Sequence, residues 1–282
     1  MLTEVQVGAK ARNQSDAQFG ILERIVATKR NEVAALRSMR ADLRRAADDA
    51  APPRPVLGPL RTSPCVGVFA EVKRRSPGAG DIDTGLDPVA LSAEYESAGA
   101  LAVSVLTDGP WFGGSLDDLL AIREERGIPV LRKDFVIDPL QVYEGRAAGA
   151  DLMLLIVRIL EPPLLADLRV MIHDLGMTAL VEVHDEREVD SALDAGAELV
   201  GVNNRDLSVF RTDLAVTERL APYLPGEVAL MSESGIGGAD DVARVAAAGA
   251  DAVLVGEALV RSGTPGRLVQ EMAAVPRVEG RR

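Results

Sequence analysis

The chain has 282 residues, of which 47% are hydrophobic and only 3% aromatic, and it carries a formal net charge of −12 at pH 7. This length suits one large α/β domain with a short extension, and the composition predicts a core of Ala, Val, Leu and Ile. The negative charge argues against nucleic acid or an anionic membrane as a partner, because both are bound by clustered Lys and Arg.

Cysteine content and hydropathy bear on the cellular location of the protein. Cys65 is the single cysteine, so no internal disulfide can form. No stretch approaches the roughly 18 consecutive apolar residues of a membrane span, and residues 1–20 lack the basic start and apolar segment of a secretory signal. We therefore expect a soluble cytoplasmic protein without a membrane partner.

Residues 1–60 are predicted to form a helical extension. The segment "FGILERIVATKRNEVAAL" (19–36) has apolar residues at helical spacing, and a second helix is expected in "SMRADLRRAADDA" (38–50). The prolines of "APPRPVLGP" (51–59) predict a non-helical linker. Because the extension is short, we expect it to cover the bottom or side of the next domain rather than to fold alone.

Residues 61–282 contain a repeating α/β pattern. Ala-Gly-Ala recurs around Gly99, Gly149, Gly196 and Gly249, and an apolar run follows each copy, as expected where a glycine-capped helix leads into a buried strand. Four further apolar runs are "VGVFAEVK", "IPVLRKDF", "MTALVEVH" and "EVALMSESG". Eight βα units predict an α/β protein with a (β/α)8 TIM barrel. The alternative is an open dinucleotide-binding sheet, but "RRSPGAGDID" lacks the required G-x-G-x-x-G spacing.

Polar side chains recur at the ends of the predicted strands. Alternate residues of a barrel strand face the interior, and active sites form at the carboxyl ends. In the first strand, Glu71 and Lys73 share the inward parity of Phe69. The other strand ends contribute Lys133, Phe135, Glu182, Asn203, Arg205 and Glu233. One such residue would usually be solvated, but burying this many without a ligand is costly, so the repetition favours a binding or catalytic site.

The last two predicted βα loops are rich in small residues. "SESGIGGADD" contains Ser234 and Gly235, and "LVGEALV" contains Gly256, in each case ahead of a helix. Backbone N–H groups in these two loops of a barrel commonly bind phosphate, and glycine permits the close approach. Glycines also serve ordinary turns, but their presence in both expected loops predicts a phosphate site.

Other chemistries have little support. His173 is expected on a helix and His184 just beyond a strand, and the chain contains no His or Cys cluster with the spacing of metal ligands. We therefore expect no metal. No motif places a histidine to activate Ser234, which argues against a serine nucleophile.

The motifs "AEVKRRSP", "FGGSLDDL", "PVLRKDF", "LVEVHDE", "GVNNRDL", "SESGI" and "VLVGEALV" occur in an order and spacing that closely resembles the indole-3-glycerol phosphate synthase family. The resemblance covers essentially the whole chain, including the helical extension. It implies a carboxy-lyase of tryptophan biosynthesis, which closes a ring in 1-(2-carboxyphenylamino)-1-deoxyribulose 5-phosphate with loss of CO₂ and water. It implies no cofactor, a small anionic substrate, and other enzymes of the pathway as candidate partners.

The resemblance also implies catalytic roles for individual residues. Lys133 would be the general acid and Glu182 its acid/base partner. Lys73 would hold the substrate carboxylate, while Glu71 and Asn203 would orient the lysines and the sugar hydroxyls. A second cation or shielding from water would lower the pKa of such a lysine and a nearby glutamate would oppose that shift, so the sequence leaves the direction open.

The remaining implied site residues bind the substrate. Phe135 and Leu154 would form an apolar slot for the aromatic ring. The phosphate would be held by Ser76, Gly235, Gly256 and the backbone at Glu257, with Arg205, Glu233 and Ser234 completing the polar wall. The sequence departs from the family pattern at Gly78-Ala79-Gly80 and Gly109-Pro110-Trp111, in two loops expected over the site.

Two other functions are compatible with such a barrel. One is a sugar-phosphate isomerase similar to phosphoribosylanthranilate isomerase, which would share the phosphate site but needs only one acid and one base. The other is a non-catalytic barrel subunit of a tryptophan-pathway assembly, against which the presence of Lys73, Lys133 and Glu182 argues.

Overall fold

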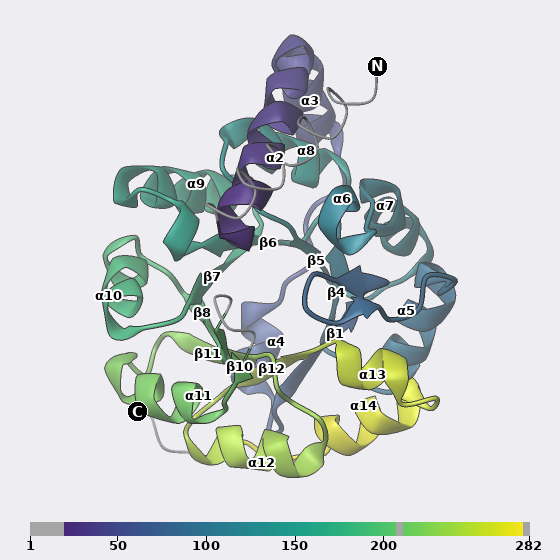
Figure 1. The fold of residues 1–282 in the computed structure, drawn as a ribbon, viewed down its shortest axis with the longest axis vertical. Coiled ribbons are helices and arrows are strands. Elements are labelled where there is room, and N and C mark those ends of the chain that lie inside the picture. Colours follow the sequence, from purple (N-terminus) through teal and green to yellow (C-terminus); the bar gives the residue numbers. More distant parts are fainter. Residues whose placement is uncertain (1–19, 207–210, 279–282) are drawn as a thin grey trace, which may run out of the picture.

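Eight parallel strands close into a barrel in the computed structural model, which describes residues 20–206 and 211–278 (Figure 1). Around the barrel the order is β1-β12-β11-β8-β7-β6-β5-β4. The strands are β1 (Gly67–Val72), β4 (Ala102–Leu106), β5 (Val130–Lys133), β6 (Leu152–Ile156), β7 (Thr178–Val183), β8 (Leu199–Asn203), β11 (Ala229–Glu233) and β12 (Ala252–Val255). The predicted (β/α)8 barrel is confirmed, and the open-sheet alternative is wrong.

Helices surround the barrel (Figure 1); they connect successive strands, and the last two follow β12. They are α5 (Pro88–Ser97), α7 (Leu116–Glu125), α8 (Pro139–Ala147), α9 (Pro162–Asp174), α10 (Glu186–Asp194), α11 (Ala215–Leu220), α12 (Ala239–Ala247), α13 (Glu257–Arg261) and α14 (Pro265–Ala273). Short 3₁₀ turns follow β6 at η2 (Val157–Ile159) and α11 at η3 (Ala221–Tyr223). His173 lies on α9 and His184 directly follows β7, as predicted.

The four Ala-Gly-Ala repeats end helices as the sequence predicts. Gly99, Gly149, Gly196 and Gly249 have φ values of 91°, 87°, 76° and 97°. A side chain is strained in this left-handed region, so glycine is the residue suited to stop each helix there. The next residues then enter β4, β6, β8 and β12.

The strands separate two apolar layers by their alternating side chains. Val68, Ala70 and Val72 of β1 pack in the layer between strands and helices, whereas Phe69 packs inside the barrel. The interior also contains Leu131, Leu152, Leu154, Leu180, Leu199, Met231 and Leu254. The predicted parity of the first strand is therefore confirmed, and it places Glu71 on the inward side above Phe69.

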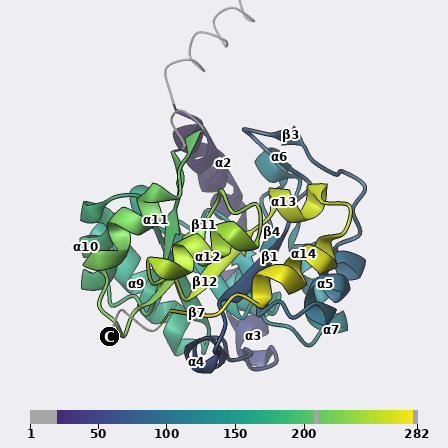
Figure 2. The same ribbon diagram turned by 90° about the horizontal axis from the view of Figure 1, so that it is seen from below.

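The extension runs along one side of the barrel. It comprises α2 (Ile21–Leu36), η1 (Arg37–Met39), α3 (Arg40–Asp49) and α4 (Leu57–Thr62). Figure 2 shows α3 and α4 at one end of the barrel and α2 reaching toward the other, where α6 (Gly109–Phe112) lies. The extension thus covers the bottom and one side, as expected, but it also reaches the mouth.

The segment 51–59 was predicted to be free of helix because of its prolines, and this is wrong at its end. Helix α4 begins at Leu57 and contains Pro59. Pro59 is tolerated because it lies in the first turn, where backbone N–H groups have no partner within the helix. The predicted domain boundary at residues 60/61 falls inside α4, and the division there remains a prediction.

Helix α2 is attached to the mouth of the barrel by a buried lysine. The side chain of Lys29 is 2% exposed, and its Nζ lies 2.9 Å from Asp108 Oδ2 and 2.9 Å from Asp134 Oδ1. Asp108 follows β4 and caps α6, and Asp134 follows β5. One ammonium group therefore ties the extension to two adjacent loops beside the site.

Two hairpins extend the mouth. The first pairs β2 (Arg75–Ser76) with β3 (Gly80–Asp81), and the second pairs β9 (Arg205–Asp206) with β10 (Arg211–Thr212). The Arg75 guanidinium donates to the carbonyls of Gly109 and Pro110 at 3.0 and 2.7 Å. The two loops that depart from the family pattern are thus joined to each other.

Replacing Lys29 by Met should lower the free energy of unfolding by about 3 to 5 kcal/mol, because Asp108 would be left buried without its cation and Asp134 would keep only Arg132 as a partner. The matched control is Arg45→Met. Arg45 forms a pair with Asp42 in which both side chains are at least 70% exposed, so its loss should cost less than about 1 kcal/mol. Urea unfolding measures both, and equal stability of the two variants would contradict the role given to Lys29.

Candidate active site

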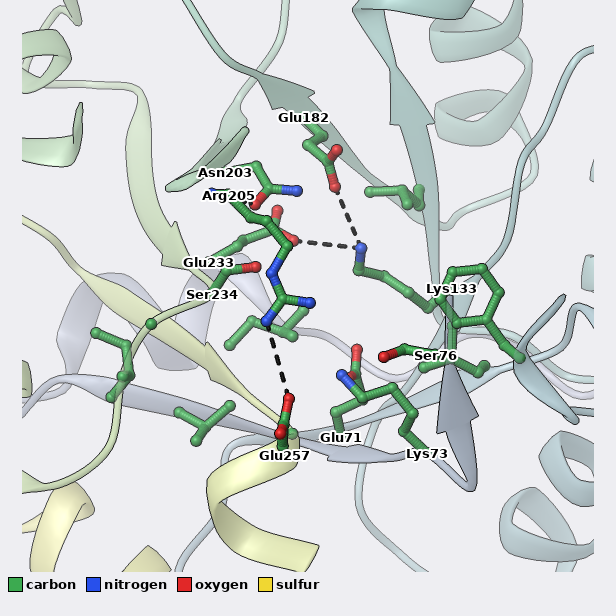
Figure 3. Close-up of a pocket in the computed structure, with 18 of the residues that line it drawn as sticks. Glu71, Lys73, Ser76, Lys133, Glu182, Asn203, Arg205, Glu233, Ser234 and Glu257 are labelled. Atoms are coloured by element: carbon green, nitrogen blue, oxygen red, sulfur yellow. Dashed lines mark hydrogen bonds and ion pairs between the residues drawn. The ribbon is translucent and has the colours of Figure 1, made fainter. Parts of the chain in front are cut away.

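All fourteen predicted site residues line one cavity of about 440 Å³ at the carboxyl ends of the strands. Figure 3 shows the polar members pointing into this space from several strands. They are Glu71, Lys73, Ser76, Lys133, Phe135, Leu154, Glu182, Asn203, Arg205, Glu233, Ser234, Gly235, Gly256 and Glu257. The barrel thus gathers residues that are up to 186 positions apart, as positions 71 and 257 are.

Lys133 lies between two buried glutamates, Glu182 and Glu233, that line the cavity. Its Nζ lies 3.2 Å from Glu182 Oε2 and 3.4 Å from Glu233 Oε2 (Figure 3). Its side chain is 15% exposed, whereas both carboxylates are 2% exposed. The ammonium therefore reaches the cavity while the glutamates lie beneath the surface.

The three groups influence one another's protonation. Burial opposes the charge on Lys133, but Glu182 and Glu233 outweigh it and raise the pKa of the lysine above its ordinary value. Burial would raise the pKa of Glu182, but Lys133, followed by His184 and Asn203, lowers it below the ordinary value. The sequence left open whether the pKa of this lysine is raised or lowered. The attraction of Lys133 to the carboxylates is the larger effect, so its pKa is raised.

Glu233 differs from Glu182 in its protonation. Burial raises its pKa to about 7; the attraction of Lys133 opposes this rise, while repulsion from Glu182 and Glu71 adds to it. Two buried carboxylates next to one cation thus divide into an ionised and a readily protonated group. Such a pair of glutamates is able to accept a proton at one carboxylate and to release one from the other.

A second lysine lies on the neighbouring wall. Lys73 Nζ is 2.6 Å from Glu71 Oε1, and the Glu71 side chain is 5% exposed. The close packing depends on Gly256, because a Cβ there would lie 2.2 Å from Glu71 Oε1 and 3.1 Å from Lys73 Nζ. The glycine that follows the last strand therefore leaves room for the ion pair at the end of the first strand.

An apolar wall lies beside the lysines. Phe135 and Leu154 line it as predicted, together with Phe112, which the sequence reasoning did not select. The Phe112 and Phe135 rings have centroids 5.9 Å apart. An aromatic residue in the loop after a barrel strand was the available signal for Phe112, since such loops surround the mouth.

The opposite wall is formed by the loops after β11 and β12. Ser234 has φ 67° and is the one non-glycine residue with positive φ among the described residues, and Gly235 follows with φ 85°. Arg205 Nη2 lies 3.9 Å from Glu257 Oε2 (Figure 3). The left-handed turn brings the backbone of Ser234 and Gly235 to the cavity, and Arg205 offsets the carboxylate at its rim.

Asn204 supports this turn and was also missed by the sequence reasoning. Its amide nitrogen lies 3.0 Å from the Ser234 carbonyl and 2.9 Å from the Glu233 carbonyl, to which it donates. Its oxygen accepts from the hydroxyl of Thr217 at 2.8 Å. Asn203, by contrast, lines the cavity. Of these two adjacent asparagines, the first therefore borders the cavity and the second stabilises the turn beside it.

Neither a metal site nor a membrane span was found. Across residues 20–206 and 211–278, His, Cys, Asp and Glu side chains do not gather in any group of three able to bind a metal ion. A search of the same residues found no helix with the length and hydropathy needed to cross a bilayer. The segment 1–19, in which no secretory signal was expected, lies outside the described residues.

Comparisons with solved structures agree with the fold. A 3-hexulose-6-phosphate synthase from Salmonella typhimurium superposes with a TM-score of 0.60 at 15% identity, covering 74% of this chain and 97% of that one. At this identity the likeness concerns the fold alone.

Comparisons with known sequences give the family. A protein from Parafrankia sp. (strain EAN1pec) named indole-3-glycerol phosphate synthase is 56% identical over 220 residues, which are 78% of this chain and 82% of that protein. One of the same name from Mycobacterium avium (strain 104) is 49% identical over 254 residues, 89% of this chain and 93% of that protein. The family model described as indole-3-glycerol phosphate synthase matches residues 22–272. The chain therefore belongs to the indole-3-glycerol phosphate synthase family.

Proposed function

We propose that this cavity converts 1-(2-carboxyphenylamino)-1-deoxyribulose 5-phosphate into indole-3-glycerol phosphate, CO₂ and water. The observation that carries the proposal is the position of Lys133, whose Nζ lies between Glu182 and Glu233 at the edge of an apolar wall. A cation with one ionised and one protonatable carboxylate beside it suits a reaction that activates a carbonyl and then moves protons.

The cavity matches the three parts of this substrate. Phe112, Phe135 and Leu154 offer an apolar surface to the aromatic ring. Lys73 offers an ammonium to the carboxylate on that ring until CO₂ leaves, and Glu71 at 2.6 Å holds the ammonium in place. The substrate is thereby oriented with its ketose carbonyl toward Lys133.

The phosphate end belongs at the loops after β11 and β12. We propose that backbone N–H groups at Gly235, Gly256 and Glu257 donate to the phosphate, with the hydroxyls of Ser76 and Ser234 on either side. Arg205 borders the same space and contributes positive charge near the Glu257 side chain. These groups would bind substrate and transition state alike, so they act mainly on KM.

Ring closure needs a donor at the carbonyl oxygen. Lys133 is held protonated by its two carboxylates, so it donates to that oxygen as the ring carbon attacks and the oxygen becomes an alkoxide. An alkoxide is far more basic than an amine, so the proton transfers even from a lysine of raised pKa. Glu233, with a pKa of about 7, can return a proton to Lys133 near neutrality.

Restoring aromaticity needs a base. After CO₂ and the hydroxyl group have left, the carbon beside nitrogen must lose a proton to complete the indole ring. Glu182 is ionised and 2% exposed, and we assign this proton to it; the proton that the departing hydroxyl takes up in the step before comes from Lys133, which Glu233 has recharged. Asn203 donates to Glu182 and orients it, as Glu71 orients Lys73.

A sugar-phosphate isomerase would explain less of the site. It needs one acid and one base, which Lys133 and Glu182 already supply, and it leaves the Lys73–Glu71 pair beside the apolar wall without a purpose. A proposed cytoplasmic location, and other tryptophan-pathway enzymes as partners, rest on the family's place in metabolism alone.

The purified protein should convert the carboxyphenylamino substrate into a product with indole absorbance and leave phosphoribosylanthranilate unchanged. Lys133→Ala should lower kcat by about a thousandfold because the acid is lost, with unchanged circular dichroism. Arg244→Ala, in an exposed pair with Glu218, serves as control and should keep full turnover. Near-normal turnover of Lys133→Ala would defeat the assignment.

Glu182→Gln keeps the shape of the side chain but removes the base. We expect kcat to fall by about a hundredfold or more while KM changes less than threefold, measured by steady-state kinetics at saturating substrate. A rise in KM with kcat preserved would instead assign Glu182 to uniform binding.

A further inference from the structure

We propose that His184, fixed by Glu188, is a positioning residue that sets the orientation and ionisation of Glu182 from behind the site. The inference rests on the proposed role of Glu182 as a base. His184 does not line the cavity, so it acts through Glu182 rather than on the substrate.

The first observation is the contact between the two side chains. His184 follows β7 two residues after Glu182, and its side chain is 5% exposed. Its Nε2 lies 3.5 Å from Glu182 Oε1, while Lys133 lies 3.2 Å from the other oxygen, Oε2. The catalytic carboxylate is therefore enclosed between an imidazole and an ammonium group.

The second observation is that the imidazole is held from its far side. Glu188 Oε2 accepts from the His184 backbone N–H at 2.7 Å and lies 3.0 Å from Nδ1. Glu188 is fixed in the first turn of α10, where its own N–H donates to Asp185 Oδ1 at 3.0 Å. A carboxylate at Nδ1 keeps a proton on that nitrogen and fixes the ring plane.

The Nε2 atom of His184 lies beside Glu182. Among the described residues it is a buried nitrogen without a hydrogen-bond partner, and Glu182 Oε1 is the acceptor in reach. Such a buried polar atom is unfavourable unless it serves an interaction. Here the interaction is the charge contact with Glu182.

Charges alternate from the cavity toward the surface. In order they are Lys133, Glu182, His184, Glu188 and Arg158, and the last pair joins Arg158 Nε to Glu188 Oε1 at 2.8 Å. The charged groups that face His184 are thus Glu182 on β7, Glu188 on α10 and Arg158 on η2. Two carboxylates against one more distant guanidinium favour the imidazolium form.

The protonation directions agree with this geometry. Burial opposes the charge on His184, but Glu188 and Glu182 outweigh it and raise its pKa above the ordinary value, while Arg158 acts in the opposite direction. Burial would likewise raise the pKa of Glu182, and His184 is the second largest of the groups that lower it, after Lys133. A positive charge behind Glu182 thus keeps it ionised between turnovers.

The test compares the two histidines of the chain. His184→Asn should lower kcat about tenfold with KM within twofold, and should move the acid limb of the kcat–pH profile upward by about one pH unit, because Glu182 loses a neighbouring cation. His173→Asn is the control, since His173 is 65% exposed on α9, and it should change neither. A His184→Asn profile equal to that of His173→Asn would overturn the inference.

Two further measurements keep the result independent of folding and of activity. Glu188→Gln keeps the imidazole and should move the acid limb in the same direction by a smaller amount. Imidazole NMR of the unmutated protein should give His184 a pKa above 6.5 that falls in Glu182→Gln, whereas His173 stays constant. If the pKa of His184 does not change in Glu182→Gln, this inference is refuted even if turnover is normal. If that pKa changes but the protein shows no turnover, the proposed function is refuted instead.

Discussion

The site depends on one constraint, which is that the ammonium of Lys133 is held within 3.4 Å of two buried carboxylates. Burying any one of these charged groups without the others would lower the stability of the fold. Together, the groups determine one another's protonation states. Lys133 stays charged, Glu182 stays ionised and Glu233 can take up a proton near neutrality. The division of acid and base roles that we propose rests on this arrangement rather than on any residue alone.

The barrel supplies the constraint through strand periodicity and through space left by small residues. Strands β1, β5, β7, β8 and β11 each carry an inward polar side chain at or near the carboxyl end, above an apolar interior, so the charges meet in a region shielded from water. Gly256 leaves room for Glu71, and Gly201 leaves room for Glu233, because a Cβ at Gly201 would lie 2.0 Å from Glu233 Oε1. The buried carboxylates therefore require a glycine on β8 and another directly after β12.

The sequence was sufficient to predict the features that recur with a regular period along the chain. The parity of β1 around Phe69 and Glu71, the capping role of Gly149 and its equivalents, and the polar strand ends of the cavity follow from a period of two and a repeated βα unit, whereas Ser76, Leu154 and Glu257 were implied by the family resemblance. What it missed depends on distances between segments that only folding defines. Lys29 against Asp134 and Lys133 against Glu233 carry no local signal, and the direction of the Lys133 pKa depends on which charge lies nearer.

The central claim is tested most directly by the protonation of Lys133. The chain has four lysines, so ¹³Cε NMR of lysine-labelled protein gives a spectrum that single Lys→Arg variants can assign. The account predicts that Lys133 remains an ammonium up to pH 10, and that its pKa falls when Glu182 and Glu233 are both replaced by Gln. A Lys133 that loses its proton between pH 6 and 8 in the unmutated protein would contradict the account.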